Sequence, residues 1–512
     1  MDLNVRGKKG WEKPHIGQEE KVMVKLKNHG LTKMRDVDER LVSYNIEMTE
    51  VTGGTFWKSY TPEQIAGTEE VVPAKSFTDF AGLMQVYPPV DLYEEKIRTY
   101  AKALGSVYIR VSGSWATDTY YDFDGRTGGI VPEGYKSILT KEQWNGVLDF
   151  VKAVDAKLLV SVSNCKGNHT DGKPWTPEQA KILFDYSKEY GVPISAAEFM
   201  NEPNMLPMDP PSPGYGAAEF GRDQDAFFQF VRENYPEVRL VGPCACGDDI
   251  GGNMGGIASM LNPFTSENLL DNCKETADVF SYHSYAGVSD RGAAMGGHWK
   301  PEEATSETYL DVVAQAAGYY EKLRDKYCPG AQMWVTETAD AGLGGNTWGS
   351  TYLDVIRDAD ELGRFPTMTD GVLFHNTLAS SDYGFLDHST HLPRPIYWVA
   401  YLWNHLMGTE VFDTEEEIRE GVHLYAHSRK DGKKGYAYLY VNNAKEKMAQ
   451  AELPANAEVY LLDAQTLRSR SLRINGKTVE GTKENLIPEI KPCRKETWVL
   501  EIPPASVAFI LV

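Results

Sequence analysis

The chain has 512 residues, too many for one ordinary hydrophobic core, so we expect one large and one smaller domain. Its 73 acidic residues outnumber its 52 basic residues, and the formal net charge of -21 argues against nucleic acid and anionic membrane surfaces as partners. No run of about 18 apolar residues occurs, so we expect no membrane span.

Residues 1–15 lack the apolar centre of a signal peptide. The compartment stays open, because a cytoplasmic protein and a secreted or periplasmic protein that has lost its signal would both fit. The six cysteines form no Cys-x-x-Cys pair, so we expect neither a zinc knuckle nor a redox motif. No metal or other cofactor is predicted.

An N-terminal strand precedes a long alternation of strands and helices. Val22, Val24 and Leu26 alternate with polar or flexible side chains, and we expect this strand, within residues 1–40, to pair with the smaller domain. Apolar runs then predict eight strands, at 41–46, 107–111, 158–163, 194–199, 239–242, 279–282, 333–336 and 372–374.

Amphipathic helices are predicted between these strands. The clearest begins at Thr176-Pro177-Glu178-Gln179, a capping box with proline at the first helical position, and ends before Gly191. The others are predicted at 141–154, 216–233, 307–326, 351–362 and 395–407. Such alternation indicates an α/β fold with parallel strands, and eight units favour a closed (β/α)8 TIM barrel over residues 41–408, with an open doubly wound sheet as the alternative.

The pattern changes after Gly408. Short strands without strong helices are predicted at 422–426, 436–441, 459–462, 472–474 and 507–512. Turn signals such as Asp431-Gly432 and Asn475-Gly476 separate them and are typical of hairpins. We therefore expect residues 409–512 to form a smaller, antiparallel β-sandwich domain.

Two carboxylic acids follow strands of the predicted barrel. Glu202, in Asn201-Glu202-Pro203-Asn204, comes after the fourth strand, and Glu337, in Trp334-Val335-Thr336-Glu337-Thr338, ends the seventh. A barrel keeps its catalytic groups at the carboxyl ends of its strands, and two opposed carboxylic acids are the usual equipment for hydrolysing a glycosidic bond. Asn201 could hold a substrate hydroxyl. The pair predicts a glycosidase.

The segment 198–204, Glu-Phe-Met-Asn-Glu-Pro-Asn, resembles the acid/base motif of clan A retaining glycosidases, and more closely that of heparanase and the β-glucuronidases of glycoside hydrolase family 79. Further stretches resemble the same family in order and spacing, at 106–113, 282–285, 334–345, 381–387 and 503–509. This motif-level similarity spans most of residues 40–512.

The resemblance implies roles for five side chains. Glu202 would serve as general acid and then base, and Glu337 as the nucleophile that forms a glycosyl-enzyme ester. Tyr285 would donate a hydrogen bond to Glu337, and His283 would line the same wall. Either Tyr285 or Arg110 could keep Glu337 ionised.

The family also implies a preference for uronic acids. Its sugar carboxylate is held by a tyrosine and by backbone N–H groups of glycines, which match Tyr383, Gly344 and Gly345 here. Glu47 matches an acidic residue that binds sugar hydroxyls. Met200 and Ala197 depart from the family pattern, which has glycine and tryptophan there.

A long insertion, 49–88, follows the first strand and is expected to overhang the cleft. Heparan sulfate would call for clustered basic residues, yet Arg110, Lys166 and Arg291 are scattered. We therefore expect an exo-acting β-glucuronidase that uses a retaining double displacement on a glucuronide or a uronic-acid-containing oligosaccharide. A heparanase-like endo-β-glucuronidase acting on glycosaminoglycan is the first alternative, and an inactive carbohydrate-binding barrel is the second.

Overall fold

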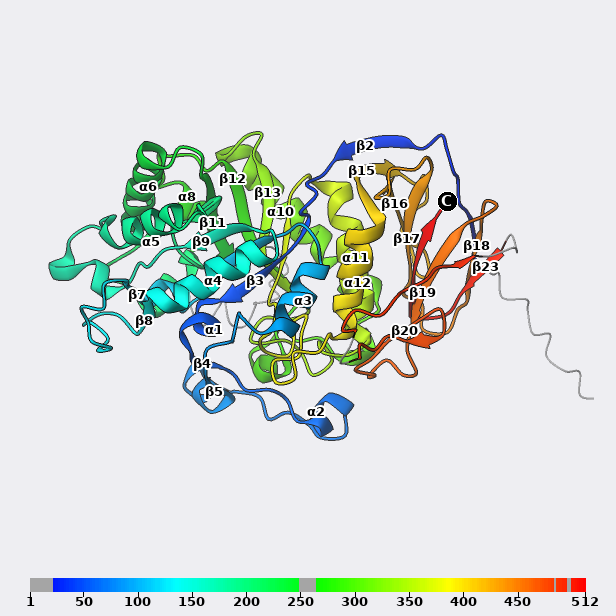
Figure 1. Ribbon diagram of the computed structural model, residues 1–512, viewed down its shortest axis with the longest axis horizontal. Coiled ribbons are helices and arrows are strands. Elements are labelled where there is room, and N and C mark those ends of the chain that lie inside the picture. Colours follow the sequence, from blue (N-terminus) through cyan, green and yellow to red (C-terminus); the bar gives the residue numbers. More distant parts are fainter. Residues whose placement is uncertain (1–21, 248–263, 483–484, 495–498) are drawn as a thin grey trace, which may run out of the picture.

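The computed structural model describes residues 22–247, 264–482, 485–494 and 499–512, so residues 1–15, where no signal peptide is expected, lie outside it. Eight parallel strands close into a barrel (Figure 1). They are β3 (Val42–Glu47), β6 (Tyr108–Ser112), β9 (Lys157–Ser161), β10 (Ala196–Glu198), β11 (Arg239–Cys246), β12 (Val279–Tyr285), β13 (Gln332–Ala339) and β14 (Leu373–His375). The predicted TIM barrel is confirmed, and the open sheet is excluded.

Helices surround this barrel. They include α3 (Glu95–Ala103), α4 (Lys141–Ala153), α5 (Glu178–Glu189), α6 (Ala217–Asn234), α8 (Ser266–Leu270), α9 (Glu307–Leu310), α10 (Val312–Tyr327), α11 (Leu353–Met368) and α12 (Pro395–Leu406). The helix predicted at 307–326 is interrupted at Asp311, which ends α9. Within the described ranges, no helix is long and apolar enough to cross a lipid bilayer.

The start of α5 differs from the predicted capping box. Pro177 is the N-cap residue and not the first helical residue, and no side chain caps this end. Gln179, expected to complete the box, instead accepts the backbone N–H of Tyr121 through its Oε1 at 2.8 Å. A tertiary hydrogen bond has therefore replaced the local one.

The second domain contains two sheets (Figure 1). The larger runs in the order β2 (Thr32–Asp36), β15 (Met407–Asp413), β16 (His423–Arg429), β17 (Tyr436–Asn442), β24 (Ser506–Leu511), β19 (Glu458–Asp463), β20 (Arg473–Ile474) and β21 (Lys477–Thr478), with β22 (Cys493–Arg494) beside β19. The smaller contains β1 (Val22–Lys25), β18 (Ala449–Glu452) and β23 (Val499–Ile502).

The two sheets enclose an apolar core that includes Val24, Leu424, Leu500 and Ile510. The pairs of the larger sheet are antiparallel, but β1 pairs with β18 in parallel, so the sandwich is not antiparallel throughout. Both termini of the described chain thus contribute strands to this domain.

A buried ionic cluster joins the barrel helix α11 to the larger sheet. His423 Nδ1 lies 2.5 Å from Asp360 Oδ1, and His423 Nε2 lies 3.0 Å from Glu307 Oε1. Arg364 Nε pairs with Asp360 Oδ2 at 3.2 Å. Burial would lower the pKa of His423, but the charge and hydrogen bonds of Asp360 and Glu307 outweigh it and raise the pKa to about 9.

This raised pKa predicts a loss of stability in alkali. Protonated His423 stabilises the folded state fully below its unfolded pKa of about 6.5, and this contribution, on the order of 3 kcal/mol, is lost as the pH rises through about 9. We expect the free energy of unfolding in urea to fall between pH 7 and 10. His423→Gln should be less stable at pH 7 and should lose much of this slope, whereas an unchanged slope would contradict the assignment.

The insertion at 49–88 folds as a separate small unit on the barrel, seen below it in Figure 1. It contains α1 (Met48–Thr52), the antiparallel pair β4 (Gly54–Trp57) and β5 (Met84–Tyr87), and α2 (Pro62–Ala66). Because α1 follows β3 directly, the unit lies at the carboxyl ends of the barrel strands. Its Tyr60 hydroxyl donates to the carbonyl of Gly345 at 3.0 Å, so it packs on a loop predicted to bind substrate.

Candidate active site

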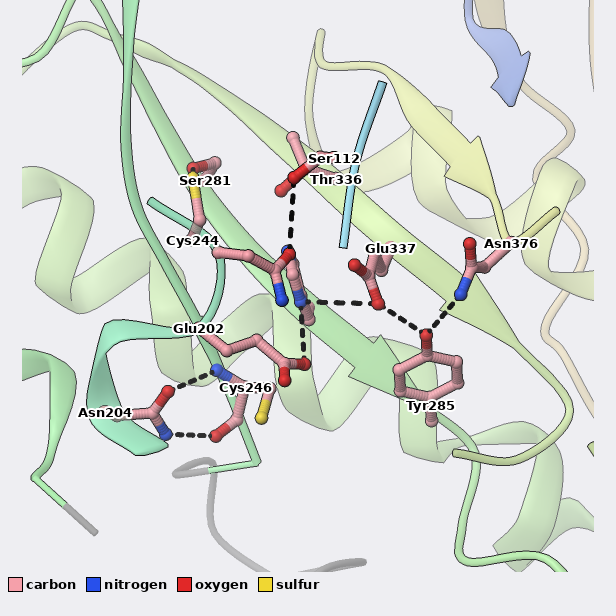
Figure 2. Close-up of polar contacts among 12 residues, drawn as sticks. Ser112, Glu202, Asn204, Cys244, Cys246, Ser281, Tyr285, Thr336, Glu337 and Asn376 are labelled. Atoms are coloured by element: carbon pink, nitrogen blue, oxygen red, sulfur yellow. Dashed lines mark hydrogen bonds and ion pairs between the residues drawn. The ribbon is translucent and has the colours of Figure 1, made fainter. Parts of the chain in front are cut away.

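Glu202 lies just beyond β10 in a strained backbone conformation. Its φ of 44° and ψ of 58° place it in the left-handed region, which favours glycine and costs other residues on the order of 1 kcal/mol. Two hydrogen bonds hold the following turn: Asn204 Nδ2 donates to the Cys246 carbonyl at 2.6 Å, and the Cys246 N–H donates to Asn204 Oδ1 at 3.1 Å (Figure 2). The Glu202 side chain remains 19% exposed.

Glu337 reaches the barrel interior because β13 is irregular. Tyr282 pairs with Val335, but His283 pairs with Glu337, so one residue of β13 is bulged out of register. Trp334 belongs to the core inside the barrel, and regular alternation would turn a residue three positions later outward. The extra residue reverses this direction for Glu337.

The two glutamates meet across a narrow gap bridged by His283. One oxygen of each carboxylate and one ring nitrogen of His283 all lie within 4.8 Å of one another. His283 Nδ1 lies 3.0 Å from Glu202 Oε1 and 3.6 Å from Glu337 Oε2. In Figure 2 the Glu202 and Glu337 side chains extend toward the same space from different walls. The structure thus brings both predicted acids together.

Arg110 organises the polar interior of the barrel. This fully buried side chain donates through Nη1 to Glu337 Oε1 at 2.9 Å and through Nη2 to Asn201 Oδ1 at 2.7 Å. Its Nε lies 3.1 Å from both oxygens of Glu198, a second buried carboxylate. Since Asn201 Oδ1 is occupied, the Asn201 Nδ2 group is the one that can donate to a substrate hydroxyl.

Glu337 is held as a carboxylate. Tyr285 donates its hydroxyl proton to Glu337 Oε2 at 2.6 Å and accepts a hydrogen bond from Asn376 Nδ2 at 2.9 Å (Figure 2). Burial would raise the pKa of Glu337, but electrostatic attraction to His283 and Arg110 and hydrogen bonds from Tyr285 and Arg110 hold it below its usual value. An ionised Glu337 can act as a nucleophile.

Glu47 occupies a tight position beside the same network. A Cβ on Gly113 would lie 1.5 Å from Glu47 Oε2, so only glycine fits there. Burial, followed by repulsion from Glu337 and Glu50, raises the pKa of Glu47 well above its usual range. Its Oε2 is buried and makes no hydrogen bond within the described chain, and the contact of Glu47 with a sugar hydroxyl stays a prediction.

The predicted carboxylate-binding residues lie together, but their backbone amides are not equivalent. The Gly345 N–H already donates to the Ala341 carbonyl at 3.2 Å, whereas the Gly344 N–H has no partner among the described residues. Asn376 Nδ2 lies 3.1 Å from the Tyr383 hydroxyl. The arrangement therefore favours Gly344 over Gly345 as the donor to a substrate carboxylate.

Within the described residues, Glu202, His283 and Glu337 are the group of acidic or imidazole side chains close enough to share a metal ion. Arg110 contacts this group directly, since its Nη1 lies 2.9 Å from Glu337 and its Nη2 lies 3.3 Å from His283 Nε2. A fixed positive charge at this distance opposes a bound cation. The same group suits proton transfer and nucleophilic attack.

Sequence reasoning missed two polar residues of this network. Glu198 lies within β10, where a charged residue in an apolar strand indicates a buried partner, here Arg110. Asn376 directly follows β14, the position that singled out Glu202 and Glu337 on other strands. A search for polar residues just after each of the eight strands would therefore have found Asn376.

No family model matches the sequence. Heparanase-like protein 1 of Arabidopsis thaliana is 23% identical over 479 residues, which cover 83% of this chain and 85% of the relative. Baicalin-beta-D-glucuronidase of Scutellaria baicalensis is 28% identical over 218 residues, 41% of this chain and 40% of that protein. Both relatives are thus similar in sequence to this protein, in which Glu202 and Glu337 converge inside the barrel.

The chain is a glycoside hydrolase that is similar to heparanase-like proteins and β-glucuronidases. The predicted resemblance and enzyme class are thereby confirmed. The fold agrees as well: a solved 4-O-alpha-L-rhamnosyl-beta-D-glucuronidase from Fusarium oxysporum 12S superposes with a TM-score of 0.63 at 12% identity, covering 96% of this chain and 100% of that one. The barrel and the sandwich are therefore both present in a known glycosidase.

Proposed function

We propose that this heparanase-like hydrolase is an exo-acting β-glucuronidase that retains the anomeric configuration. The separation of the two acids carries the proposal, because one oxygen of Glu202 and one of Glu337 lie within 4.8 Å. Retaining glycosidases place their carboxyl groups about 5–5.5 Å apart, whereas inverting enzymes leave about 6.5–9.5 Å for a water molecule. The narrow gap favours direct attack by the enzyme.

The geometry supports the following sequence of steps. Glu337, ionised and oriented by Tyr285 and Arg110, attacks the anomeric carbon while Glu202 gives a proton to the departing oxygen. Glu202, then a carboxylate, removes a proton from water, which attacks the same carbon and releases Glu337. His283 contacts both carboxylates and keeps Glu202 beside the reacting bond.

Two features support glucuronate as the sugar. The N–H of Gly344, which has no partner among the described residues, can donate to an anion without help from a neighbouring cation. The Tyr383 hydroxyl lies 3.1 Å from Asn376 Nδ2, so it can accept from Asn376 and donate to a carboxylate. Both groups lie on the loops that follow β13 and β14.

Two further features favour cleavage at the end of the carbohydrate substrate. The insertion contacts Gly344 and Gly345 through Trp57 and Tyr60, and so fills space beside the predicted carboxylate pocket, where a 1,4-linked chain would continue. The basic residues considered for sulfate binding are already paired: Lys166 lies 3.0 Å from an oxygen of Asp209. Arg110 and Arg291 are buried and bonded to carboxylates.

Activity on matched substrates tests the proposal. We expect hydrolysis of aryl β-D-glucuronides well above aryl β-D-glucosides, with β-glucuronic acid as the first product in proton NMR. Hyaluronan and heparan oligosaccharides should lose sugars only from the non-reducing end. An α-anomer as first product would contradict retention, and internal fragments from either polymer would favour the endo-acting alternative.

Removing the Tyr383 hydroxyl tests the carboxylate contact. Tyr383→Phe keeps the ring but deletes a hydrogen bond to a charged group, which is worth about 1.5–3 kcal/mol, so kcat/KM for glucuronides should fall by roughly 10–100-fold. The value for the corresponding glucoside should change little, because that sugar has no carboxylate. An unchanged ratio between the two substrates would end the assignment.

A further inference from the structure

Arg291 is a buried cation outside the catalytic network, and its guanidinium touches three separate segments. It is 2% exposed. Its Nη1 donates to the carbonyls of Leu343 at 3.1 Å and Gly345 at 3.0 Å, in the glycine-rich loop. Its Nη2 donates to the Lys58 carbonyl at 2.7 Å, in the insertion, and to Asp382 Oδ2 at 2.6 Å, beside Tyr383.

These bonds fix the direction of one peptide dipole. The C=O and N–H of a trans peptide unit point in opposite directions. Because the Leu343 carbonyl faces Arg291, the N–H of Gly344, which belongs to the same peptide unit, points away from Arg291. This is the amide that has no partner within the described chain. Arg291 thus orients the Gly344 N–H through the Leu343 carbonyl.

The loop needs such support because its backbone is strained. Leu343, Gly344 and Gly345 all have positive φ, of 63°, 86° and 84°. For leucine this conformation is unfavourable, because its Cβ lies too close to the following carbonyl oxygen. A Cβ on Gly344 would lie 2.6 Å from Ser381 Oγ and 2.7 Å from Trp57, so the loop is also tightly enclosed. Hydrogen bonds from Arg291 hold the strained turn in place.

The same guanidinium links the insertion to the loop that carries Tyr383. It stacks over the Tyr60 ring at 3.8 Å, and the Tyr60 N–H donates to Asp382 Oδ2 at 3.3 Å. The Asp382 N–H in turn donates to the Gly344 carbonyl at 3.1 Å. Loss of the guanidinium would therefore remove hydrogen bonds from all three segments at once.

We propose that Arg291 is a positioning residue that sets the preference for uronic acids: through Leu343 and Asp382 it orients the Gly344 N–H and the Tyr383 hydroxyl toward the substrate carboxylate. This inference rests on the proposed glucuronidase function. Arg291 is 2% exposed and its two Nη groups donate to protein oxygens, so we expect it to act through the groups that it positions. Its removal should impair binding of the carboxylate more than the chemical step at Glu337.

The test compares Arg291→Lys with the unchanged enzyme on an aryl β-D-glucuronide and the matching aryl β-D-glucoside. Lysine keeps the charge but cannot make the forked contacts of a guanidinium. We expect kcat/KM for the glucuronide to fall by roughly 10–100-fold, mostly through KM, with little change for the glucoside. Arg364→Lys is the matched control, because Arg364 is also buried and ion-paired but lies in α11 beside the sandwich.

A second variant keeps the inference testable if Arg291→Lys does not fold. Asp382→Asn removes the charged partner of Arg291 and should lower the ratio of glucuronide to glucoside activity in the same direction. An equal loss of activity on both sugars, or an unchanged ratio of glucuronide to glucoside activity in the folded variants, would overturn the role of Arg291 but not the proposed function. An unaltered enzyme that shows no preference for the glucuronide would overturn the proposed function and this inference together.

Discussion

Replacing Glu337 by glutamine should abolish turnover of aryl β-D-glucuronides, with kcat lower by on the order of 10^5-fold. The amide keeps the size of the carboxylate: its oxygen can accept from Arg110, which now reaches Glu337 Oε1 at 2.9 Å, and its NH2 group can donate to the Tyr285 hydroxyl, which now lies 2.6 Å from Oε2. It cannot form the ester intermediate with the sugar. Initial-rate measurements with a chromogenic glucuronide give the size of the loss.

Glu50→Gln is the matched control for this substitution. Glu50 is also buried and lies close to the site, where its Oε2 accepts the N–H of Glu47 at 2.7 Å. Burial raises the pKa of Glu50 to about 8, so the side chain is mostly protonated at neutral pH and glutamine resembles it in charge and shape. This variant should keep nearly normal activity. Ordinary turnover by Glu337→Gln would show that another group is the nucleophile.

Replacing Glu202 by alanine should produce a loss that depends on the leaving group. An alkyl or sugar leaving group needs a proton as the bond breaks, and general acid catalysis contributes about 10^2–10^4-fold, so rates on such glucuronides should fall by roughly 10^3-fold. An activated phenol leaves without help. With that substrate the glycosyl-enzyme should form quickly and then persist, because no base remains to activate water.

Azide provides the second part of this test. A small anion can occupy the space left by the Glu202 side chain and attack the ester on Glu337 without a general base. We expect azide to raise turnover of the activated substrate and to yield a β-glucuronosyl azide, which NMR identifies. Equal losses on good and poor leaving groups, together with no azide product, would remove Glu202 from the acid/base role.

Much of the fold could be predicted from the sequence, because barrel strands are buried on both faces and read as continuous apolar runs. All eight predicted runs overlap strands of the closed barrel. The helix α3 was missed since only Ile97, Tyr100 and Ala101 of its nine residues are buried. Short, mostly polar helices give a weak periodic signal.

The candidate site was predictable only in part. Strand ends located Glu202 and Glu337, but the bulge in β13 that turns Glu337 inward depends on its pairing with β12 and leaves no local pattern. The contacts of Arg291 join residues 58, 343 and 382, which are neighbours only after folding. Likewise, nothing near Gly345 in the sequence indicates that the Ala341 carbonyl occupies its N–H.

Trapping of the covalent intermediate tests most directly whether Glu202 and Glu337 act across one sugar. An activated 2-deoxy-2-fluoro-β-glucuronide slows both steps, and its good leaving group lets the first step proceed, so the ester should accumulate. Mass spectrometry of the intact protein should then show one added sugar, and peptide mapping should place it on Glu337. A label on any other residue, or release of product with no labelled enzyme, would contradict this account.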